Sequence, residues 1–412
     1  MFNKDSIMLK IGIVKETKIP TDNRVALTPK DIIDLQGKYP QVKFYVQKSD
    51  IRAYADCEYE KHGIPVVDSL NDCDILFGVK EVKLDSLIPN KHYFFFGHIA
   101  KEQSYNRPLI QKMIESNITF TDYEYLVDDD NQRLCAFGWW AGVIGAYNTI
   151  RAYGLRTSKF ELEKPNLDFT LEKLISNLKE VSHLCNTSII ITGNGRVSKG
   201  AQYTMQEIGA KELTPDSFLN REQSAELVYT VLTVKDLVKH KDGLDFNNDD
   251  FKQNGQDYVS VFSKYAYSSE ILLSCHFWDP SQPVYLDEEL LKDKNLSIKI
   301  VGDVTCDIKG SILSTIRSST HDEPFYDFNP TNMSEEPAFS NMNNITVMAV
   351  DTCPNALALD TSSYFSQKLS EHVLPLLINR ELNHPILERA TILSNGELTK
   401  KYSYLKRYAG LL

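Results

Sequence analysis

The sequence predicts an α/β protein of two domains, each built on a mostly parallel β-sheet, with a cleft between the two domains. Three observations support this prediction: the length of the chain, the alternation of short apolar runs with helical patterns, and a glycine turn near the middle of the chain. The chain has 412 residues, which is long for one hydrophobic core and fits two domains of ordinary size.

The first part of the chain alternates predicted strands with predicted helices. Thr28 and Pro29 are residue types of a helix N-cap and first turn, so we expect a helix from there through Leu35. The strands predicted in this part are residues 11–14, 42–46, 75–79, 93–96 and 118–120. Strands that alternate with helices form mostly parallel sheets.

The second part of the chain contains another set of predicted strands. Residues 137–153 are apolar and rich in small side chains, and we expect them to form a buried helix that links the domains. Residues 188–192 form a strand, and a helix follows from about 200 to 208. The strands expected to extend the second sheet are residues 258–262, 271–275, 298–301 and 345–350. The residue pattern of the polar segment 213–254 does not indicate how this segment is arranged in the fold.

These patterns predict two domains with different roles. Residues 1–140, joined by about 355–412 through a helix after Asp351, are expected to form a substrate and catalytic domain. Residues about 141–354 are expected to form a dinucleotide-binding domain.

Composition and charge exclude several classes of protein. Hydrophobic residues make up 42% of the chain and charged residues 25%, which is typical of a globular protein. The net charge is −11 without a basic stripe, so we expect no nucleic-acid partner. No apolar run has the length of a membrane span, and the first residues lack the apolar run of a signal peptide. Seven cysteines without CxxC spacing indicate reduced thiols and no metal site, so we expect a cytoplasmic protein.

A glycine turn follows the strand at residues 188–192. Gly193 suits a tight turn, Gly195 lets the backbone approach a pyrophosphate, and the next helix offers N–H groups to the anion. The third fingerprint position is Ser198, with Gly200 two residues later. An ordinary strand–helix turn is the alternative, but the good strand and helix patterns around it favour a Rossmann-like dinucleotide site.

The residue that would bind the adenosine ribose is not defined by the sequence. Asp216 is the nearest acidic candidate, and a plain turn residue is an equally good interpretation of it. Both NAD and NADP therefore stay open as cofactors.

Charged side chains follow several strands of the first domain. Lys80 follows residues 75–79, His98 follows residues 93–96, and Arg24 lies in the loop after the first strand. Each of them alone is more often a solvated group. Because successive strands deliver polar groups at the same end, we expect a pocket for a small anionic substrate.

Imine formation would explain such a set of side chains. An amine must attack a ketone in its neutral form, which needs a proton acceptor, and the carbinolamine must lose water, which needs a proton donor. A cationic surrounding lowers the pKa of a lysine, so Lys80 suits the first role, and His98 suits the second. Arg24 and Arg133 could hold carboxylates through paired hydrogen bonds.

Ten sequence blocks, in order, carry a family resemblance. They are KETKIPTDNRVALTP, DILFGVKE, YFFFGHIAKEQ, DYEYL, RLCAFGWWAGVIG, GNGRVSKGAQ, DVTCDIKGSI, HDEPFYDF, MAVDTCP and SNGELTKKYSYL. In these blocks the chain resembles saccharopine dehydrogenase (L-lysine-forming), also called lysine–2-oxoglutarate reductase. The closer likeness is to the reductase half of the bifunctional aminoadipate-semialdehyde synthase. The two-domain plan resembles that of alanine dehydrogenase and transhydrogenase.

The resemblance implies the condensation of L-lysine with 2-oxoglutarate to saccharopine, or its reverse, with NAD or NADP. It implies that Lys80 is the proton acceptor and His98 the proton donor. The substrate contacts that it implies are Arg24, Gln103, Arg133, Phe137, Thr305, Cys306 and Asp307. The resemblance also implies cofactor contacts in addition to Gly193 and Gly195 of the turn. These are Arg196, Val197, Val304, Asp351, Thr352, Cys353 and Pro354.

The chain departs from the family pattern at three places. Gln132 stands where the fungal enzyme has an arginine, Ala358 where proline is usual, and Cys306 where alanine is usual. Because the chain ends at Leu412, we expect the saccharopine-cleaving half of the bifunctional enzyme to be absent. Two alternatives stay open: another amino-acid dehydrogenase such as alanine dehydrogenase, and a catalytically silent sensor of nucleotide or lysine.

Overall fold

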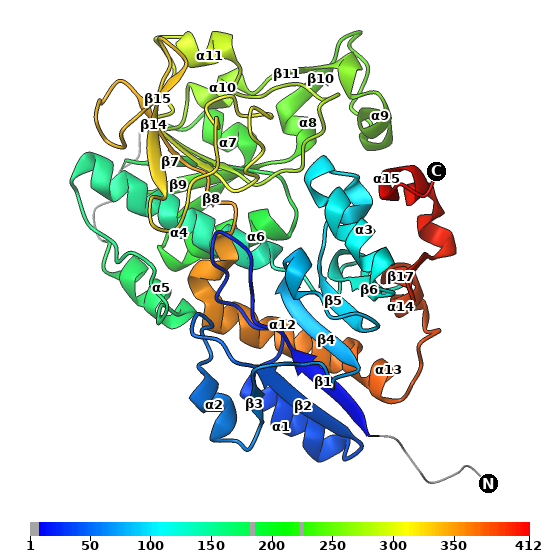
Figure 1. The fold of residues 1–412 in the computed structure, drawn as a ribbon. Helices are drawn as coiled ribbons and strands as arrows, with labels where there is room; N and C mark the ends of the chain where they lie inside the picture. Colours follow the sequence, from blue (N-terminus) through cyan, green and yellow to red (C-terminus); the bar gives the residue numbers. More distant parts are fainter. Residues whose placement is uncertain (1–7, 182–185, 223–225) are drawn as a thin grey trace. The chain divides into compact units, whose positions relative to one another are not determined.

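The computed structural model describes residues 8–181, 186–222 and 226–412 (Figure 1). The start of the chain and Cys185, which entered the predictions above, lie outside the described residues. The chain divides into two compact units. Unit 1 consists of Met1–Phe137 and Ala358–Leu412, and unit 2 is Gly138–Leu357. Among the described residues, no helix has the length and apolar character that crossing a membrane requires.

Unit 1 is built on a sheet that has eight strands among the described residues, in the order β18-β17-β6-β5-β4-β1-β2-β3. The strands are β1 (Leu9–Ile13), β2 (Val42–Gln47), β3 (Val66–Val67), β4 (Ile75–Lys80), β5 (His92–Phe96), β6 (Thr119–Asp122), β17 (Thr391–Ser394) and β18 (Glu397–Leu398). All pairs from β3 to β6 are parallel, and the two C-terminal strands add an antiparallel edge. The central strands β4 and β5 are buried and apolar except for Lys80 at the end of β4 and His92 at the start of β5, because helices cover a parallel sheet on both faces.

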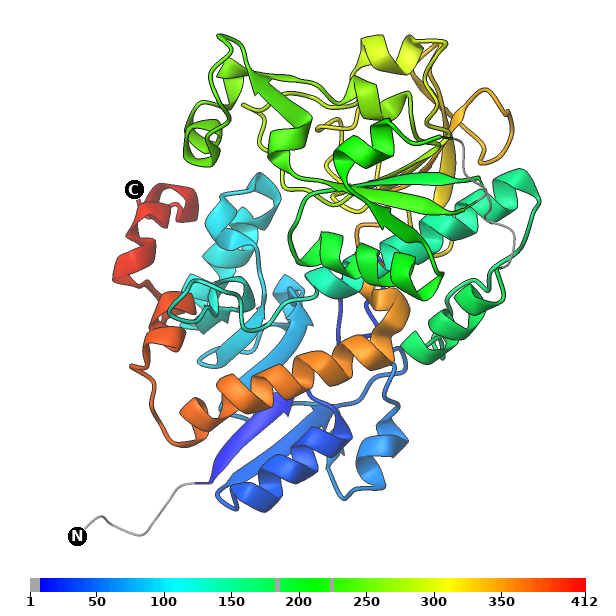
Figure 2. The same ribbon diagram turned by 180° about the vertical axis from the view of Figure 1, so that it is seen from behind.

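Helix α1 (Pro29–Lys38) begins where the sequence predicts, with the hydroxyl of Thr28 accepting a hydrogen bond from the backbone N–H of Asp31. Helix α12 (Ala358–His372) brings the end of the chain back to unit 1 and contacts α1 (Figure 2). The hydroxyls of Ser362 and Ser366 accept hydrogen bonds from the loop between β1 and α1. The other helices of unit 1 are α2 (Asp56–Glu60), α3 (Arg107–Glu115), α13 (Leu374–Ile378), α14 (Pro385–Ala390) and α15 (Lys406–Ala409).

Unit 2 contains a second sheet, again with eight strands in the described part, in the order β15-β14-β16-β13-β12-β7-β9-β8. The strands are β7 (Ser188–Thr192), β8 (Lys211–Leu213), β9 (Val228–Leu232), β12 (Ile271–Ser274), β13 (Ile300–Asp303), β14 (Phe325–Asn329), β15 (Ser334–Glu336) and β16 (Ile345–Met348). The pairs from β8 to β16 are parallel, and β14 and β15 form an antiparallel edge. The predicted fold class, two Rossmann-like domains with mostly parallel sheets, is confirmed.

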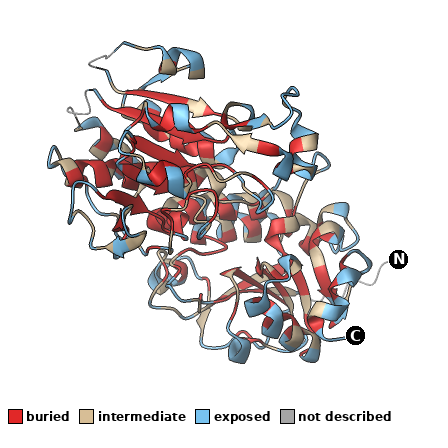
Figure 3. Cartoon of the chain, turned by 90° about the horizontal axis from the view of Figure 1, so that it is seen from above, coloured by how far each residue is buried: buried red, intermediate tan, exposed pale blue. Residues whose placement is uncertain are grey.

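Two helices of unit 2 pack backbone against backbone. Helix α4 (Gly138–Thr157) is almost entirely buried and crosses α6 (Arg196–Glu207). A Cβ at Gly142 would lie 1.9 Å from the carbonyl oxygen of Val197, and one at Gly200 would lie 1.9 Å from that of Trp139. Figure 3 shows buried residues along the strands and exposed residues along the loops and outer helix faces. The other helices are α5 (Leu171–Lys179), α7 (Pro215–Leu219), α8 (Val234–Leu237), α9 (Asn248–Gln253), α10 (Ser263–Ala266) and α11 (Glu288–Lys292).

Two strand predictions for unit 2 need correction. Residues 258–262 contain β11 (Tyr258–Ser260), but this strand pairs with β10 (Val238–His240) in a separate antiparallel ladder and does not extend the second sheet. The polar segment 213–254, in turn, contains β9, which lies directly beside β7. A strand's residue pattern shows that it is extended but not which strand it pairs with.

Candidate functional site

Lys80 is the last residue of β4, and its side chain is half-buried. Burial, together with the positive charges of Arg24 and Lys18, lowers the pKa of its amine. The contribution of the neighbouring positive charges agrees with the prediction made for Lys80. A lysine whose pKa is lowered in this way has more of the neutral amine that proton transfer near neutral pH requires.

Arg24 is buried in the loop between β1 and α1, where its charge is paired within the protein. Its guanidinium donates two hydrogen bonds to Asp22, with Nε 2.9 Å from Oδ1 and Nη2 2.5 Å from Oδ2. The guanidinium also lies 4.2 Å from the centre of the Phe137 ring. Although burial acts to raise it, the pKa of Asp22 is lowered by Arg24. The predicted carboxylate clamp therefore already binds one carboxylate of the chain itself.

His98 follows β5 and lies beside a buried carboxylate. Its Nδ1 is 3.3 Å from Oε2 of Glu124, which also forms ion pairs with Lys101, at 3.0 Å, and with Arg133, at 2.6 Å. Burial acts to raise the pKa of Glu124, but the hydrogen bond with His98 and the two cations lower it to about 2. An ionised Glu124 thus orients His98 and gathers both cations around it.

The predicted substrate residues are divided between the two units. Arg24, Gln103, Arg133 and Phe137 belong to unit 1, whereas residues 305–307 belong to unit 2. Gln103 is exposed, and its side-chain oxygen accepts a hydrogen bond from the hydroxyl of the neighbouring Tyr105. Phe137 stacks on Phe365, with ring centres 4.7 Å apart.

The glycine turn of unit 2 has the geometry that an anionic ligand requires. Gly193 has a φ of +86°, and a Cβ there would lie 2.9 Å from the carbonyl oxygen of Cys275, so only glycine fits. Gly195 is the N-cap of α6, and among the described residues no atom lies within 4 Å of the place where its Cβ would be. The first N–H groups of a helix point out of its N-terminal end and attract anions, and here they are the N–H groups at the start of α6.

The other predicted cofactor residues follow β13 and β16, at the same edge of the sheet as the turn. The buried Asp303 accepts hydrogen bonds from the hydroxyls of Thr305 and Thr315, both at 2.6 Å, and so fixes the loop after β13. Cys306, with a φ of +55°, directs its thiol to the carbonyl oxygen of Ala349 at 3.2 Å. Carboxyl ends of adjacent parallel strands form one edge, so the turn, residues 304–307 and residues 351–354 lie along it.

Val304 and Asp216, which the sequence suggests as cofactor contacts, differ in their place in unit 2. The side chain of Val304 packs against α4, since a Cβ at Gly145 would lie 2.4 Å from its Cγ2. Asp216 lies in the first turn of α7, whose N-cap is Thr214, and this helix follows β8, the outermost strand of the sheet in the described residues. The strand beside β7 is β9, and it leads to Thr233, whose hydroxyl donates to Asp236 at 2.7 Å. The strand order therefore does not support Asp216 as the ribose ligand.

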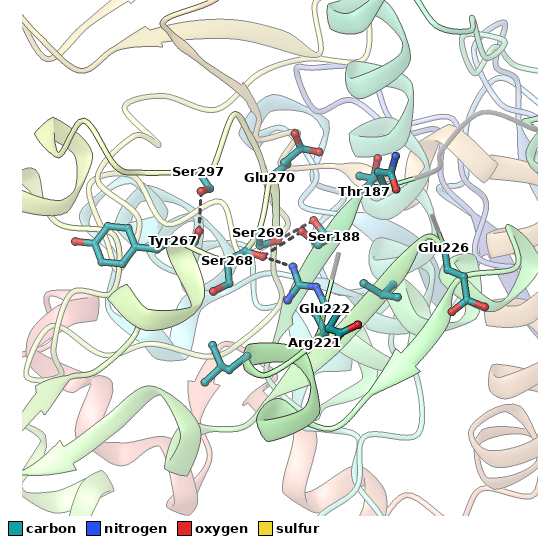
Figure 4. A pocket seen from close by; sticks show the side chains of 13 residues that line it. Thr187, Ser188, Arg221, Glu222, Glu226, Tyr267, Ser268, Ser269, Glu270 and Ser297 are labelled. Atoms are coloured by element: carbon teal, nitrogen blue, oxygen red, sulfur yellow. Dashed lines mark hydrogen bonds between the residues drawn. The ribbon is translucent and has the colours of Figure 1, made fainter. Parts of the chain in front are cut away.

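A pocket of about 630 Å³ lies at the opposite edge of the unit 2 sheet (Figure 4). Its wall includes Ser188 and Val228, the first residues of β7 and β9, and Arg221, whose guanidinium donates to the carbonyl oxygen of Ser268 at 2.5 Å. Because the glycine turn follows the carboxyl end of β7, this pocket is separate from the predicted cofactor residues.

Solved structures identify the class of protein to which this fold belongs. A structure of L-alanine dehydrogenase matches with a TM-score of 0.64 at 14% identity, over 97% of this chain and 99% of that one. The transhydrogenase from Sinorhizobium meliloti matches with a TM-score of 0.61 at 13% identity, over 95% of this chain and 100% of that one. Residues 12–144 match the family described as alanine dehydrogenase/PNT, N-terminal domain. The chain has the alanine dehydrogenase and transhydrogenase fold.

Curated relatives show which proteins the sequence resembles. Alpha-aminoadipic semialdehyde synthase from Arabidopsis thaliana is 30% identical over 96% of this chain and 41% of its own length. The saccharopine dehydrogenase [NAD(+), L-lysine-forming] of Candida glabrata is 26% identical over 89% of this chain and 93% of its own length. The chain spans less than half the length of the synthases that it matches. The chain is similar to these synthases and saccharopine dehydrogenases along most of its length, which confirms the resemblance predicted from its sequence blocks.

Proposed function

We propose that this protein is an oxidoreductase of lysine metabolism that condenses L-lysine with 2-oxoglutarate and reduces the product to saccharopine, or catalyses the reverse. The observation that carries the proposal is the placement of Lys80 and His98 at the ends of the adjacent parallel strands β4 and β5. The pKa of Lys80 is lowered, and the ring of His98 contacts the ionised carboxylate of Glu124. The names of the relatives support the choice of substrate.

In the proposed reaction, the neutral amine of Lys80 accepts the proton that the attacking substrate amine gives up. His98, held by Glu124, donates a proton to the oxygen that leaves as water. Arg133, whose side chain is 44% exposed, is our first candidate for a substrate carboxylate, and Arg24 could bind one only in addition to its pairing with Asp22. A bound NAD or NADP would supply or accept the hydride.

We assign the binding of that cofactor to unit 2. Gly193, Gly195 and the first N–H groups of α6 would hold its pyrophosphate, and the space above Gly195 fits this role. Residues 304–307 and 351–354 lie at the same sheet edge and complete the candidate site.

A steady-state assay with two substrate pairs tests the proposed reaction. We expect oxidation of reduced cofactor with lysine plus 2-oxoglutarate, and none with ammonia plus pyruvate. Turnover only with ammonia and pyruvate would identify an alanine dehydrogenase, and turnover with neither pair would favour the sensor. NADH and NADPH are assayed in parallel, which decides the cofactor preference.

Cell fractionation tests the proposed cytoplasmic location, since the rat, bovine and mouse relatives carry the word mitochondrial in their names.

Arg133→Ala tests the charge requirement of the substrate. A charged hydrogen bond to a carboxylate contributes roughly 1.5–3 kcal/mol, so the Michaelis constant for 2-oxoglutarate or saccharopine should rise by about ten- to a hundredfold. Cofactor affinity should not change. Arg317→Ala is the matched control, because Arg317 is about as exposed as Arg133 and also pairs with a glutamate. A loss of cofactor affinity instead would place Arg133 at the nucleotide, and no change in either constant would make it a surface residue.

A further inference from the structure

Regular strand geometry is interrupted just before Lys80 and at His98 itself. Phe77 pairs with Phe94 across β4 and β5, but Lys80 pairs with Phe96, so β4 contains one extra residue just before Lys80. His98 has a left-handed backbone with a φ of +51°. A bulge or a left-handed residue redirects the following side chain and takes N–H groups out of the strand ladder. These N–H groups need other acceptors, because they are buried.

A buried carboxylate supplies the acceptors for Lys80. Glu16 follows β1, the neighbour of β4, and is 9% exposed. Its Oε1 accepts a hydrogen bond from the N–H of Val79 at 2.7 Å, and its Oε2 accepts one from the N–H of Lys80 at 2.9 Å. The hydroxyl of Tyr123 donates to the carbonyl oxygen of Gly78 at 2.8 Å, so both sides of the bulge are held by buried side chains.

A second buried carboxylate does the same for His98. Asp122 is the last residue of β6, the neighbour of β5, and is completely buried. Its Oδ2 accepts hydrogen bonds from the N–H groups of Gly97, at 3.2 Å, and His98, at 3.1 Å. Its Oδ1 accepts one from the N–H of Glu124 at 2.9 Å, which also places the carboxylate that contacts the His98 ring.

We propose that Glu16 and Asp122 are positioning residues that place Lys80 and His98 by holding their main-chain N–H groups. This inference rests on the proposed function, because it gives Lys80 and His98 the roles assigned there. In the strand order β6-β5-β4-β1, Asp122 ends β6 and contacts the residues that follow β5, and Glu16 follows β1 and contacts the end of β4. The two carboxylates therefore lie on opposite sides of the strand pair that carries His98 and Lys80. Both oxygens of Glu16 and both oxygens of Asp122 accept main-chain hydrogen bonds. These carboxylates therefore act on the reaction through the positions of Lys80 and His98.

Glu16→Gln is expected to lower kcat by about ten- to a hundredfold, because small displacements of a catalytic group have effects of this size. The amide keeps one acceptor, but its NH₂ group faces the second N–H donor. The Michaelis constants should change by less than about threefold. The assay is run above the pKa of Glu16, which burial raises to about 8, so that the wild-type carboxylate is ionised. Asp122→Asn should have the same effect through His98.

Asp327→Asn is the matched control. Asp327 is a completely buried carboxylate in β14 of unit 2, and its Oδ2 accepts hydrogen bonds from the N–H groups of Ser340, at 3.1 Å, and Asn341, at 3.4 Å. This variant should lose stability as Glu16→Gln does but keep its kcat. Amide hydrogen exchange at Lys80, which needs no turnover, should become faster in Glu16→Gln and stay unchanged in the control.

A double variant separates failure of this inference from failure of the proposed function. If Glu16 acts through Lys80, Glu16→Gln should cause no further loss in a Lys80→Met background, and an additive loss would overturn the inference. Near-wild-type turnover of Lys80→Met would refute the proposed function itself. An inactive Lys80→Met together with wild-type kcat and exchange in Glu16→Gln would overturn only the positioning role. If Glu16→Gln does not fold, Tyr123→Phe replaces it as the test, and unchanged kcat and exchange there would overturn the inference.

Discussion

Lys80→Met and His98→Gln are each expected to lower turnover by about two to four orders of magnitude, the usual contribution of a general acid or base. Methionine keeps the length of the lysine side chain but cannot accept a proton. Because burial and two neighbouring cations lower the pKa of Lys80, the condensation rate of the wild type should fall as the pH drops below that value. This acidic limb should be missing from the residual activity of Lys80→Met.

Lys83→Met and His62→Gln serve as matched controls for this pair. Both positions are exposed, and Lys83 lies only three residues beyond Lys80. Each control should keep wild-type turnover, and circular dichroism with a melting curve should show that all four variants fold. If Lys80→Met and His98→Gln both retained wild-type turnover, their acid–base assignment would be wrong.

Much of the fold follows from local patterns in the sequence. The parallel strands are short apolar runs, α1 begins at the predicted Thr28 cap, and β7 leads straight into Gly193. What local pattern does not contain is long-range pairing. The sequence therefore missed that β9 lies beside β7 and that β11 belongs to a different ladder, since the residues that pair are distant in sequence.

The candidate site shows the same division. Lys80 and His98 could be found because each follows a recognisable strand, and strand ends are where polar groups gather in α/β folds. Their partners could not be assigned in the same way. Glu16 lies 64 residues from Lys80, and Glu124 lies 26 residues from His98, so both contacts exist only once the strand order is known. The sequence signal for such a partner is an acidic residue shortly after a strand, as Glu124 is after β6.

Gly195→Val should weaken the binding of reduced nicotinamide cofactor by at least about a hundredfold, because the pyrophosphate has to approach the backbone at this residue. The variant itself should fold. Gly195 has a φ of −80°, which valine adopts easily, and among the described residues no atom lies within 4 Å of the added Cβ. Gly193→Val would be a poorer test, because its positive φ and the nearby Cys275 carbonyl make misfolding the expected result.

Fluorescence titration with NADH and NADPH measures this effect, with Gly37→Val as the matched control. Gly37 lies on the exposed side of α1, where an added Cβ also meets open space, so the control carries the same backbone substitution without a ligand nearby. We expect wild-type affinity in Gly37→Val and no measurable binding in Gly195→Val. We expect a slightly lower melting temperature for Gly195→Val, because Gly195 is the N-cap of α6 and valine is a poor N-cap residue. This small loss does not affect the interpretation of the binding measurement. A folded Gly195→Val protein with unchanged affinity would mean that the cofactor is not bound at this turn, because a valine side chain and a pyrophosphate cannot share the same space.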